Sequence, residues 1–261
     1  MRRTDATALL DGLQALVADS GVKGMIPIAA RGAATARPFL DYVISSLADV
    51  GITDVVIVLG PEHDTVREYY ATTAPPTRVR VRFALQAHAL GTANAVIAAA
   101  EVIGDEPFVV LNADNYYPAD ALRRLVSRDS AATVAFDREA LVRDGNIDRE
   151  RVRAFAVLDV SEQDTLRGII EKPGETLDVD APRARWVGMN CWVVTAAIVD
   201  ACRRVPQSVR GEYELPEAVA LALREGTVVR AERVALPVLD LSQRTDIPAV
   251  VERLAAVEPR P

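Results

Sequence analysis

The sequence is poor in the residues that build metal centres and disulfide frameworks. It has only two cysteines, Cys191 and Cys202, and only two histidines, His63 and His88, among 261 residues. Two histidines cannot form a multi-histidine metal centre. Both cysteines lie in apolar runs, which is typical of buried free thiols in a reducing compartment. We therefore expect neither a disulfide nor a zinc site.

Long apolar runs and an excess of positive charge are also lacking. No stretch approaches the roughly 18 apolar residues that a membrane span requires, and the basic start Met1-Arg2-Arg3 leads into no clean apolar signal core. Thirty Lys and Arg against 37 Asp and Glu give a net charge of −7, which repels nucleic-acid backbones. We expect a cytoplasmic protein with no membrane or nucleic-acid partner; the sequence leaves open whether it forms a homo-oligomer.

Half of the 261 residues are hydrophobic, and no Ser/Gly linker, repeat or low-complexity tract interrupts them, so we expect a single domain over residues 1–261. Strand and helix patterns alternate in the first half, which predicts an α/β fold with a mostly parallel sheet. From about residue 130, strand patterns follow one another without long helices, which predicts antiparallel additions. The expected helices are 4–20, 37–50, 62–70, 92–102, one that begins at about 118, 195–204, 213–224 and 244–256, and the expected strands are 55–59, 79–85, 108–111, 132–136, 153–160, 166–171 and 227–236.

Ligands of an open α/β sheet bind outside the carboxyl ends of the strands, so the segments after strands are the places to look for chemistry. Two of these segments carry an aspartate. Asp114 follows the apolar run 107–111 directly, and Asp240 closes the run that begins at Pro237. Magnesium commonly uses one or two carboxylates together with substrate phosphates. The alternative is that each acid is an ordinary turn or helix-capping residue.

The segment 86–95 combines a glutamine, a turn and a Gly-Thr helix start. Gln86 can read a nucleobase edge, Gly91 allows a ring to approach the backbone, and the free N–H groups around Thr92 suit anions. The alternative is a plain strand-to-helix turn in which Thr92 caps the helix.

Four further polar residues stand in positions that suit a ligand. Glu171 and Lys172, followed by Pro173, end a strand and could hold a sugar hydroxyl and a phosphate, or could be a charged strand end. Lys23 is either a phosphate ligand or an exposed lysine. Asn190 interrupts an apolar strand, so it is either hydrogen-bonded in the core or turned toward a ligand.

Taken in order, these segments resemble the sugar-phosphate nucleotidyltransferases, also called nucleotide-sugar pyrophosphorylases. The match runs from about Lys23 to about Val250. The run from Lys23 to Ile28 resembles the family's lysine motif PK-x-LLP-[IV], residues 86–95 resemble Q-x-x-x-x-GTA-x-A, residues 111–115 resemble L-x-GDN, and residues 171–173 are EKP. Each motif is short, but their joint order and spacing are specific.

The resemblance implies a Rossmann-like three-layer α/β/α fold with a mixed central sheet, which binds nucleotide in its first half, about 1–130, and sugar phosphate in its second, about 131–261. It also implies transfer of a nucleotidyl group from a nucleoside triphosphate to a sugar or cyclitol phosphate with release of pyrophosphate, by positioning and charge neutralisation. The roles it implies are catalysis for Lys23, Asp114 and Lys172, nucleotide binding for Gln86, Gly91, Thr92 and Asn112, sugar-phosphate binding for Asn115, Glu171, Lys172 and Asn190, and Mg²⁺ coordination for Asp114 and Asp240.

Two departures from the family pattern stand out. Ala113 occupies a position where the family has glycine, which adds a methyl group near the nucleotide. The family's opening strand and Gly-rich loop, LAAG-x-GTR, whose N–H groups cradle the triphosphate, has no counterpart in the printed chain. Either the natural start lies upstream of Met1, or the chain has lost the cradle. In both cases the central sheet of these 261 residues is expected to lack a strand.

The missing loop motivates a second functional hypothesis, a non-catalytic homologue that binds sugar nucleotides or regulates an active subunit. A third hypothesis is glycosyl transfer from a nucleotide-sugar, with Asp114 holding the metal. The lysine motif at Lys23 and the segment at Glu171 argue against this third hypothesis, because such transferases need no attacking phosphate.

Overall fold

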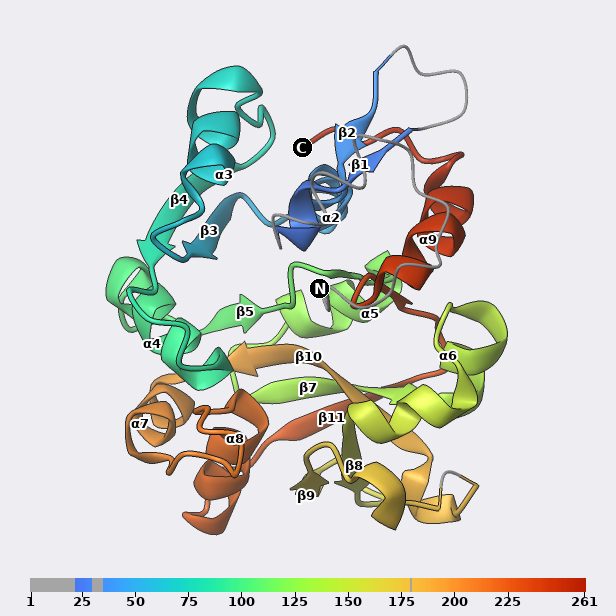
Figure 1. Ribbon diagram of the computed structural model, residues 1–261. Helices are drawn as coiled ribbons and strands as arrows, with labels where there is room; N and C mark the ends of the chain where they lie inside the picture. Colours follow the sequence, from blue (N-terminus) through green and yellow to red (C-terminus); the bar gives the residue numbers. More distant parts are fainter. Residues whose placement is uncertain (1–21, 30–34, 179) are drawn as a thin grey trace.

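The computed structural model describes residues 22–29, 35–178 and 180–261, and its elements form the mixed α/β fold expected from the sequence (Figure 1). The helix expected over residues 4–20 lies outside the described residues. The other expected helices are present, and α3 continues into a π-helical turn. One helix was not expected: α6, which begins because the Asp137 carboxylate accepts hydrogen bonds from the backbone N–H groups of Glu139 and Ala140. The α-helices are α2 Phe39–Asp49, α3 Asp64–Glu68, α4 Thr92–Ile103, α5 Ala119–Val126, α6 Arg138–Asp144, α7 Ala196–Arg204, α8 Leu215–Arg224 and α9 Ile247–Leu254.

Short helical turns and twelve strands complete the described part of the chain. The turns are η1 Lys23–Met25, η2 Tyr69–Thr73, η3 Arg149–Ala154, η4 Gly174–Thr176, η5 Pro182–Ala184 and η6 Arg244–Asp246. The strands are β1 Pro27–Ile28, β2 Arg37–Pro38, β3 Asp54–Leu59, β4 Arg80–Leu85, β5 Phe108–Val110, β6 Asn115–Tyr116, β7 Ala132–Asp137, β8 Ala156–Val160, β9 Leu166–Ile170, β10 Trp186–Val194, β11 Arg230–Val234 and β12 Leu239–Asp240.

The largest sheet has six strands and is built around β10. Its order is β11-β7-β10-β8-β9, and β5 pairs with β10 beyond the end of β8. Strand β7 runs along one edge of β10, and β8 and β5 share the other edge. The crossover through α5 makes β5 and β7 run in the same direction. Strand β10 lies between them and runs in the opposite direction, and it is antiparallel to β8 as well.

The expectation of a mostly parallel sheet is therefore wrong, although the mixed α/β class is confirmed. Among the described strands, only β3–β4 and β7–β11 pair in parallel. The expectation relied on the alternation of strands and helices along the chain. That alternation does not show where a later strand such as β10 will insert.

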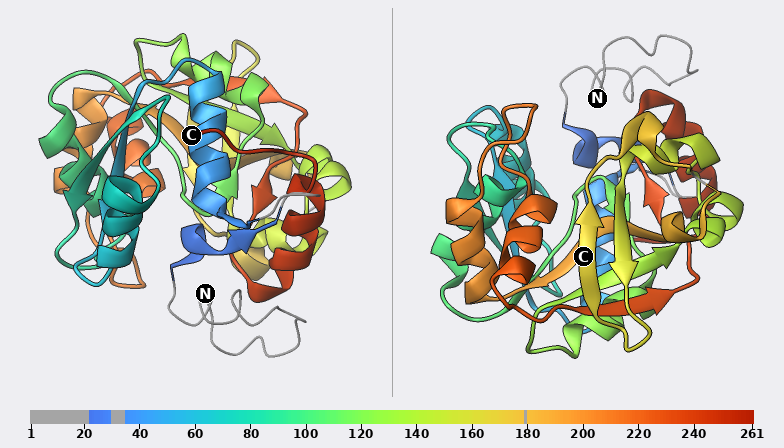
Figure 2. Two further views of the ribbon diagram at one scale, coloured as in Figure 1. Left: turned by 90° about the horizontal axis from the view of Figure 1, so that it is seen from above. Right: turned by 90° about the horizontal axis from the view of Figure 1, so that it is seen from below.

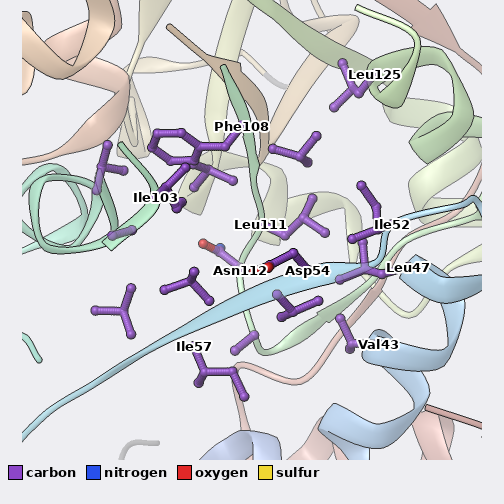
Figure 3. A pocket seen from close by; sticks show the side chains of 18 of the residues that line it. Val43, Leu47, Ile52, Asp54, Ile57, Ile103, Phe108, Leu111, Asn112 and Leu125 are labelled. Atoms are coloured by element: carbon purple, nitrogen blue, oxygen red, sulfur yellow. The ribbon is translucent and has the colours of Figure 1, made fainter. Parts of the chain in front are cut away.

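Strands β3 and β4 form a separate two-stranded sheet, which Figure 1 shows apart from β5 and β10. No backbone ladder joins the two sheets within the described residues. The space between them is a cavity of about 620 Å³. Figure 3 shows apolar side chains pointing into it, among them Ile57 of β3, Val43 and Leu47 of α2, and Phe108 of β5. The expected gap in the central sheet is thus visible in the described part of the chain.

Helices cover the six-stranded sheet and separate its core into two main clusters. One contains Leu122 and Leu125 of α5 and Leu141 of α6, and the other contains Ile198 of α7 and Val219 of α8. Both views in Figure 2 place α7 and α8, in orange, on the opposite side of the molecule from α9, in red. A third cluster joins α2 and α9 to β3. The six-stranded sheet is therefore covered on both faces, which explains its nearly continuous apolar runs.

Candidate active site

The end of β5 and the turn η1 bring a lysine and an aspartate into contact. The Lys23 ammonium lies 2.8 Å from Oδ2 of Asp114. A Cβ on Gly24 would lie 3.4 Å from Cβ of Leu40 and 3.7 Å from the carbonyl oxygen of Ala113, which is ordinary van der Waals contact, so η1 packs directly against α2 and the segment that carries Asp114. The two side chains are about one quarter exposed, 26% for Lys23 and 23% for Asp114. The pair therefore still meets solvent and can exchange partners.

Asp240 lies beside this pair because β12 pairs with β6. Asp240 is directly opposite Asn115 in the register, and the N–H of Leu241 donates to the carbonyl oxygen of Asp114 at 2.8 Å. Both aspartates line one cavity of about 340 Å³. The structure thus brings together the two acids that are 126 positions apart in the sequence.

The carboxylate of Asp240 is buried and surrounded by donors. Its Oδ1 accepts from Nδ2 of Asn115 and from Oγ of Ser242, both at 2.8 Å. Its Oδ2 accepts from the Arg151 guanidinium and, at 3.4 Å, from the N–H of Ser242. Burial and the nearby charge of Asp114 raise the pKa of Asp240, against the opposing effects of Ser242 and Arg151.

These oxygens suit a hard divalent cation, which prefers carboxylate ligands. Among the described residues no group of three or more His, Cys, Asp or Glu side chains is placed to hold a metal ion. A cation at Asp114 and Asp240 would therefore take its remaining ligands from water or substrate phosphates. Oδ1 of Asp114 accepts no hydrogen bond from any described residue, so one ligand position is open.

The turn before α4 is held by the segment that leads into α8. Gly91 has φ +105°, and a Cβ on it would lie 2.5 Å from the carbonyl oxygen of Tyr213. The chain's own backbone, at Tyr213, therefore requires glycine here. Oγ1 of Thr92 accepts from the N–H of Leu215 at 2.8 Å, so Thr92 caps the start of α8 and makes no cap bond to its own helix. The alternative of Thr92 as the cap of the following helix is wrong.

The amide nitrogen of Gln86 is hydrogen-bonded within the protein. Nε2 donates to the carbonyl oxygen of Gly91 at 2.9 Å and to Oδ1 of Asn94 at 3.1 Å. Both amide hydrogens are thus engaged, and the amide oxygen is the atom left to meet a ligand. Asn94, which the sequence analysis did not single out as a site residue, fixes this orientation.

On the other side of the cavity, Glu171 and Lys172 follow β9. Lys172 has φ +42°, an uncommon conformation for a residue other than glycine. Its ammonium lies 3.3 Å from Glu171 and 3.7 Å from Glu214, and Arg210 also pairs with Glu214. Burial raises the pKa of Glu171 to about 7; Lys172 opposes this, while a hydrogen bond to Glu214 adds to it. The pKa of Glu214 is lowered by Arg210, against the opposing effect of burial. Below about pH 7 a protonated Glu171 can therefore donate to an ionised Glu214.

Asparagines line the floor of the cavity. Nδ2 of Asn112 donates to Oδ1 of Asn115 at 3.2 Å, and Asn115 is buried with its own amide turned to Asp240. Asn190 lies within the irregular part of β10 with φ +50°, and its Oδ1 accepts from the indole N–H of Trp192 at 3.3 Å. Asn112, Asn115 and Asn190 all line this cavity.

Besides Asn94, two residues beside the site were missed by the sequence analysis. Arg151 contacts Asp240 from 89 positions away, and no local pattern announces such a contact. Glu214 stands in the sequence as an acid just before an expected helix, and the structure pairs it with Lys172. The spacing of Arg210 and Glu214, four residues apart, was the one available sign of a charged cluster there.

A model of the Nucleotidyl transferase family matches residues 26–233 of this chain. The chain belongs to this family. It is 28% identical over 235 residues to the UTP–glucose-1-phosphate uridylyltransferase AglF of Haloferax volcanii, with 89% of this chain and 87% of AglF covered. It is 25% identical over 216 residues to the low-salt glycan biosynthesis nucleotidyltransferase Agl11 of the same organism, of which it spans only 54%.

Solved structures agree with the fold of this nucleotidyltransferase family member. A UTP-bound UGPase from Acinetobacter baumannii superposes with a TM-score of 0.71 at 20% identity, covering 91% of this chain and 87% of that one. The UDP-glucose pyrophosphorylase from the same organism gives a TM-score of 0.70 with the same coverage and identity. The expected family and fold class are thereby confirmed. No helix in the described ranges is long and apolar enough to cross a membrane.

Proposed function

We propose that this nucleotidyltransferase transfers a nucleoside monophosphate from a nucleoside triphosphate to a sugar or cyclitol phosphate and releases pyrophosphate. The observation that carries the proposal is that Asp114, which pairs with Lys23, and Asp240 line the same cavity as Glu171 and Lys172. A cavity lined by both acids and cations suits two phosphorylated substrates and a divalent cation.

The two substrates would occupy the two halves of the chain. The nucleotide would lie over about residues 1–130, against Gln86, Gly91, Thr92 and Asn112, and the sugar phosphate over about residues 131–261 together with Asn115. Glu171 and Asn190 would accept or donate hydrogen bonds to sugar hydroxyls, and Lys172 would pair with the sugar's phosphate. The exposed amine of Lys172 supports this role, because 42% of its side chain is open to the cavity and solvent.

Asp114 and Asp240 would hold magnesium, which when bound would supply positive charge against the triphosphate. Lys23 lies 2.8 Å from Asp114 with 26% of its side chain exposed, so its ammonium would pair with a phosphate oxygen of the bound triphosphate.

The reaction would be an in-line displacement. An anionic oxygen of the sugar phosphate attacks the α-phosphorus, the new P–O bond forms, and the bond to the β-phosphate oxygen breaks, with the electron pair leaving on pyrophosphate. The attacking oxygen already carries negative charge, so no general base is required. The residues of this chain would act by holding the two anions in line and by balancing their charge.

The choice of nucleotide is proposed from the free oxygen of Gln86. A carbonyl oxygen accepts from the imide N–H of uracil or thymine. The printed names of two relatives fit a pyrimidine, since AglF is a uridylyltransferase and a Streptomyces griseus relative, 26% identical over 220 residues, is a glucose-1-phosphate thymidylyltransferase. We therefore place UTP and dTTP with glucose 1-phosphate first in a substrate panel.

The test is pyrophosphate release measured across four nucleoside triphosphates and a set of sugar and cyclitol phosphates. We expect one combination to turn over and Asp114→Asn to lower kcat/KM by at least about 100-fold, as for loss of a group that stabilises transition-state charge. Asp120→Asn is the matched control, because Asp120 is an exposed aspartate on α5 away from the cavity. Tight nucleotide binding without turnover in every combination would overturn the proposal in favour of a non-catalytic binding protein.

A further inference from the structure

The Arg151 guanidinium donates a hydrogen bond to the buried carboxylate of Asp240. The guanidinium lies between two aspartates, at 2.5 Å and 3.2 Å from the two carboxylate oxygens of Asp246 and in direct contact with Oδ2 of Asp240. The side chain of Arg151 is 16% exposed, and those of Asp240 and Asp246 are 2% and 4% exposed. The three groups form a closed ion cluster at the edge of the site.

The hydrogen bonds of Asp240 leave no room for a further ligand. An ionised carboxylate has about four acceptor positions. Asn115 and the Ser242 hydroxyl use Oδ1, while Arg151 and the Ser242 N–H use Oδ2. Asp114 differs, because Lys23 is the one described residue that donates to its carboxylate. A cation can therefore reach Asp114 directly, but it reaches Asp240 only if a donor leaves.

Of the donors to Asp240, Arg151 is the one that keeps a second charged partner when it withdraws. A guanidinium does not deprotonate in proteins, so its charge opposes a divalent cation at the same oxygen. When it withdraws from Asp240, its two hydrogen bonds to Asp246 still compensate its charge. Asp246 is itself fixed, because its Oδ2 accepts from the N–H of Gln243 at 2.7 Å.

We propose that Arg151 is a resident cation that competes with the divalent metal for Asp240, and that Asp246 receives the guanidinium when the metal binds. This inference rests on the metal site of the proposed function. It follows that metal binds weakly to the free protein, and that the negative charge of a nucleotide is needed to bring the metal in. Arg151 is thus a positioning residue: because it holds Asp240 in the free protein, the metal binds together with the nucleotide.

The test measures Mn²⁺ binding to the substrate-free protein by electron paramagnetic resonance, which needs no turnover. We expect Arg151→Gln to tighten Mn²⁺ binding about tenfold or more, since it removes a full charge from the ligand. Asp246→Asn should have the opposite effect and weaken binding, because the guanidinium loses its second partner and stays on Asp240. Arg149→Gln is the matched control, since Arg149 lies on the same turn but pairs with Glu139 and Asp180.

The outcomes distinguish a failure of the Arg151 competition from a failure of the proposed metal site. Asp114→Asn, made in the Arg151→Gln background, should abolish Mn²⁺ binding; if binding persists, the proposed metal site is wrong. If Asp114→Asn abolishes binding but neither Arg151→Gln nor Asp246→Asn shifts it, the site stands and the competition is wrong. Circular dichroism checks folding of each variant, and Asp246→Asn carries the test alone if Arg151→Gln does not fold.

Discussion

The six-stranded sheet and the two-stranded sheet differ in how completely they are packed. Strand β10 has neighbours on both edges, and the side chains of Trp192, Val194 and Cys191 are fully buried. Strand β3 pairs only with β4 among the described strands, and its other side meets the 620 Å³ cavity. The same kind of β-branched apolar run thus lies in a closed core in one region and beside an open space in the other.

The cavity bears on stability as well as shape. Side chains that face it have no packing partner on that side, so they lose part of the dispersion contacts that a close-packed core provides. Side chains around it therefore contribute less than similar side chains in the closed sheet.

The largest expected effect compares two leucines. Leu158 of β8 is 1% exposed in the closed region, so we expect Leu158→Ala to lower the free energy of unfolding by about 2–5 kcal/mol. Leu111 lines the cavity, and Leu111→Ala should cost less than half as much, because it deletes fewer contacts and enlarges a space that already exists. Urea unfolding measures both values. Equal losses would show that the cavity wall is packed as tightly as the closed sheet.

The next effect concerns the carboxyl group of Glu171, which lies beyond β9 and is 11% exposed. The native pKa is about 7, against an ordinary value of 4.5, so the native state holds a proton that the unfolded chain has lost between these pH values. The stabilisation is full below about pH 4.5 and is lost as the pH rises to about 7. Relative to wild type, Glu171→Gln should therefore gain about 1–3 kcal/mol between pH 5 and pH 8.

Unfolding curves at the two pH values check this sign. Gln86, beyond β4 of the two-stranded sheet, is the matched control, because Gln86→Ala neither adds nor removes a titrating group and should change the free energy of unfolding equally at both pH values. A Glu171→Gln curve that parallels wild type across the range would contradict the raised pKa.

The smallest effect should change sign between the two regions. Ala201 of α7 is fully buried, and we expect Ala201→Leu to destabilise the protein by about 1–3 kcal/mol through overpacking. Ala99 of α4 lines the cavity, so Ala99→Leu should be neutral or raise stability by up to about 1 kcal/mol. Thermal unfolding of both variants is sufficient. A loss at Ala99 as large as that at Ala201 would mean that the cavity is not free to accept a side chain.

Local patterns predicted most elements and several of the polar residues that line one cavity. The apolar run at 55–59 became β3, the Ala-rich run after Gly91 became α4, and the acids at 114 and 240 came to line one cavity. These predictions worked because the period of apolar residues and the ends of strands depend on neighbouring residues. The insertion of β10 depends on residues far away, so the sheet was wrongly expected to be mostly parallel.

The sequence by itself determined the α/β class, the family and the set of polar residues that follow the strands, because these depend on residue type and spacing. Only the tertiary structure decided how those residues are used: that Thr92 caps α8, that Gln86 keeps only its oxygen free, and that Arg151 covers Asp240. Each of these is a contact between distant segments. Its energy depends on burial and on the directions of individual lone pairs and N–H groups, which the order of residues along the chain does not express.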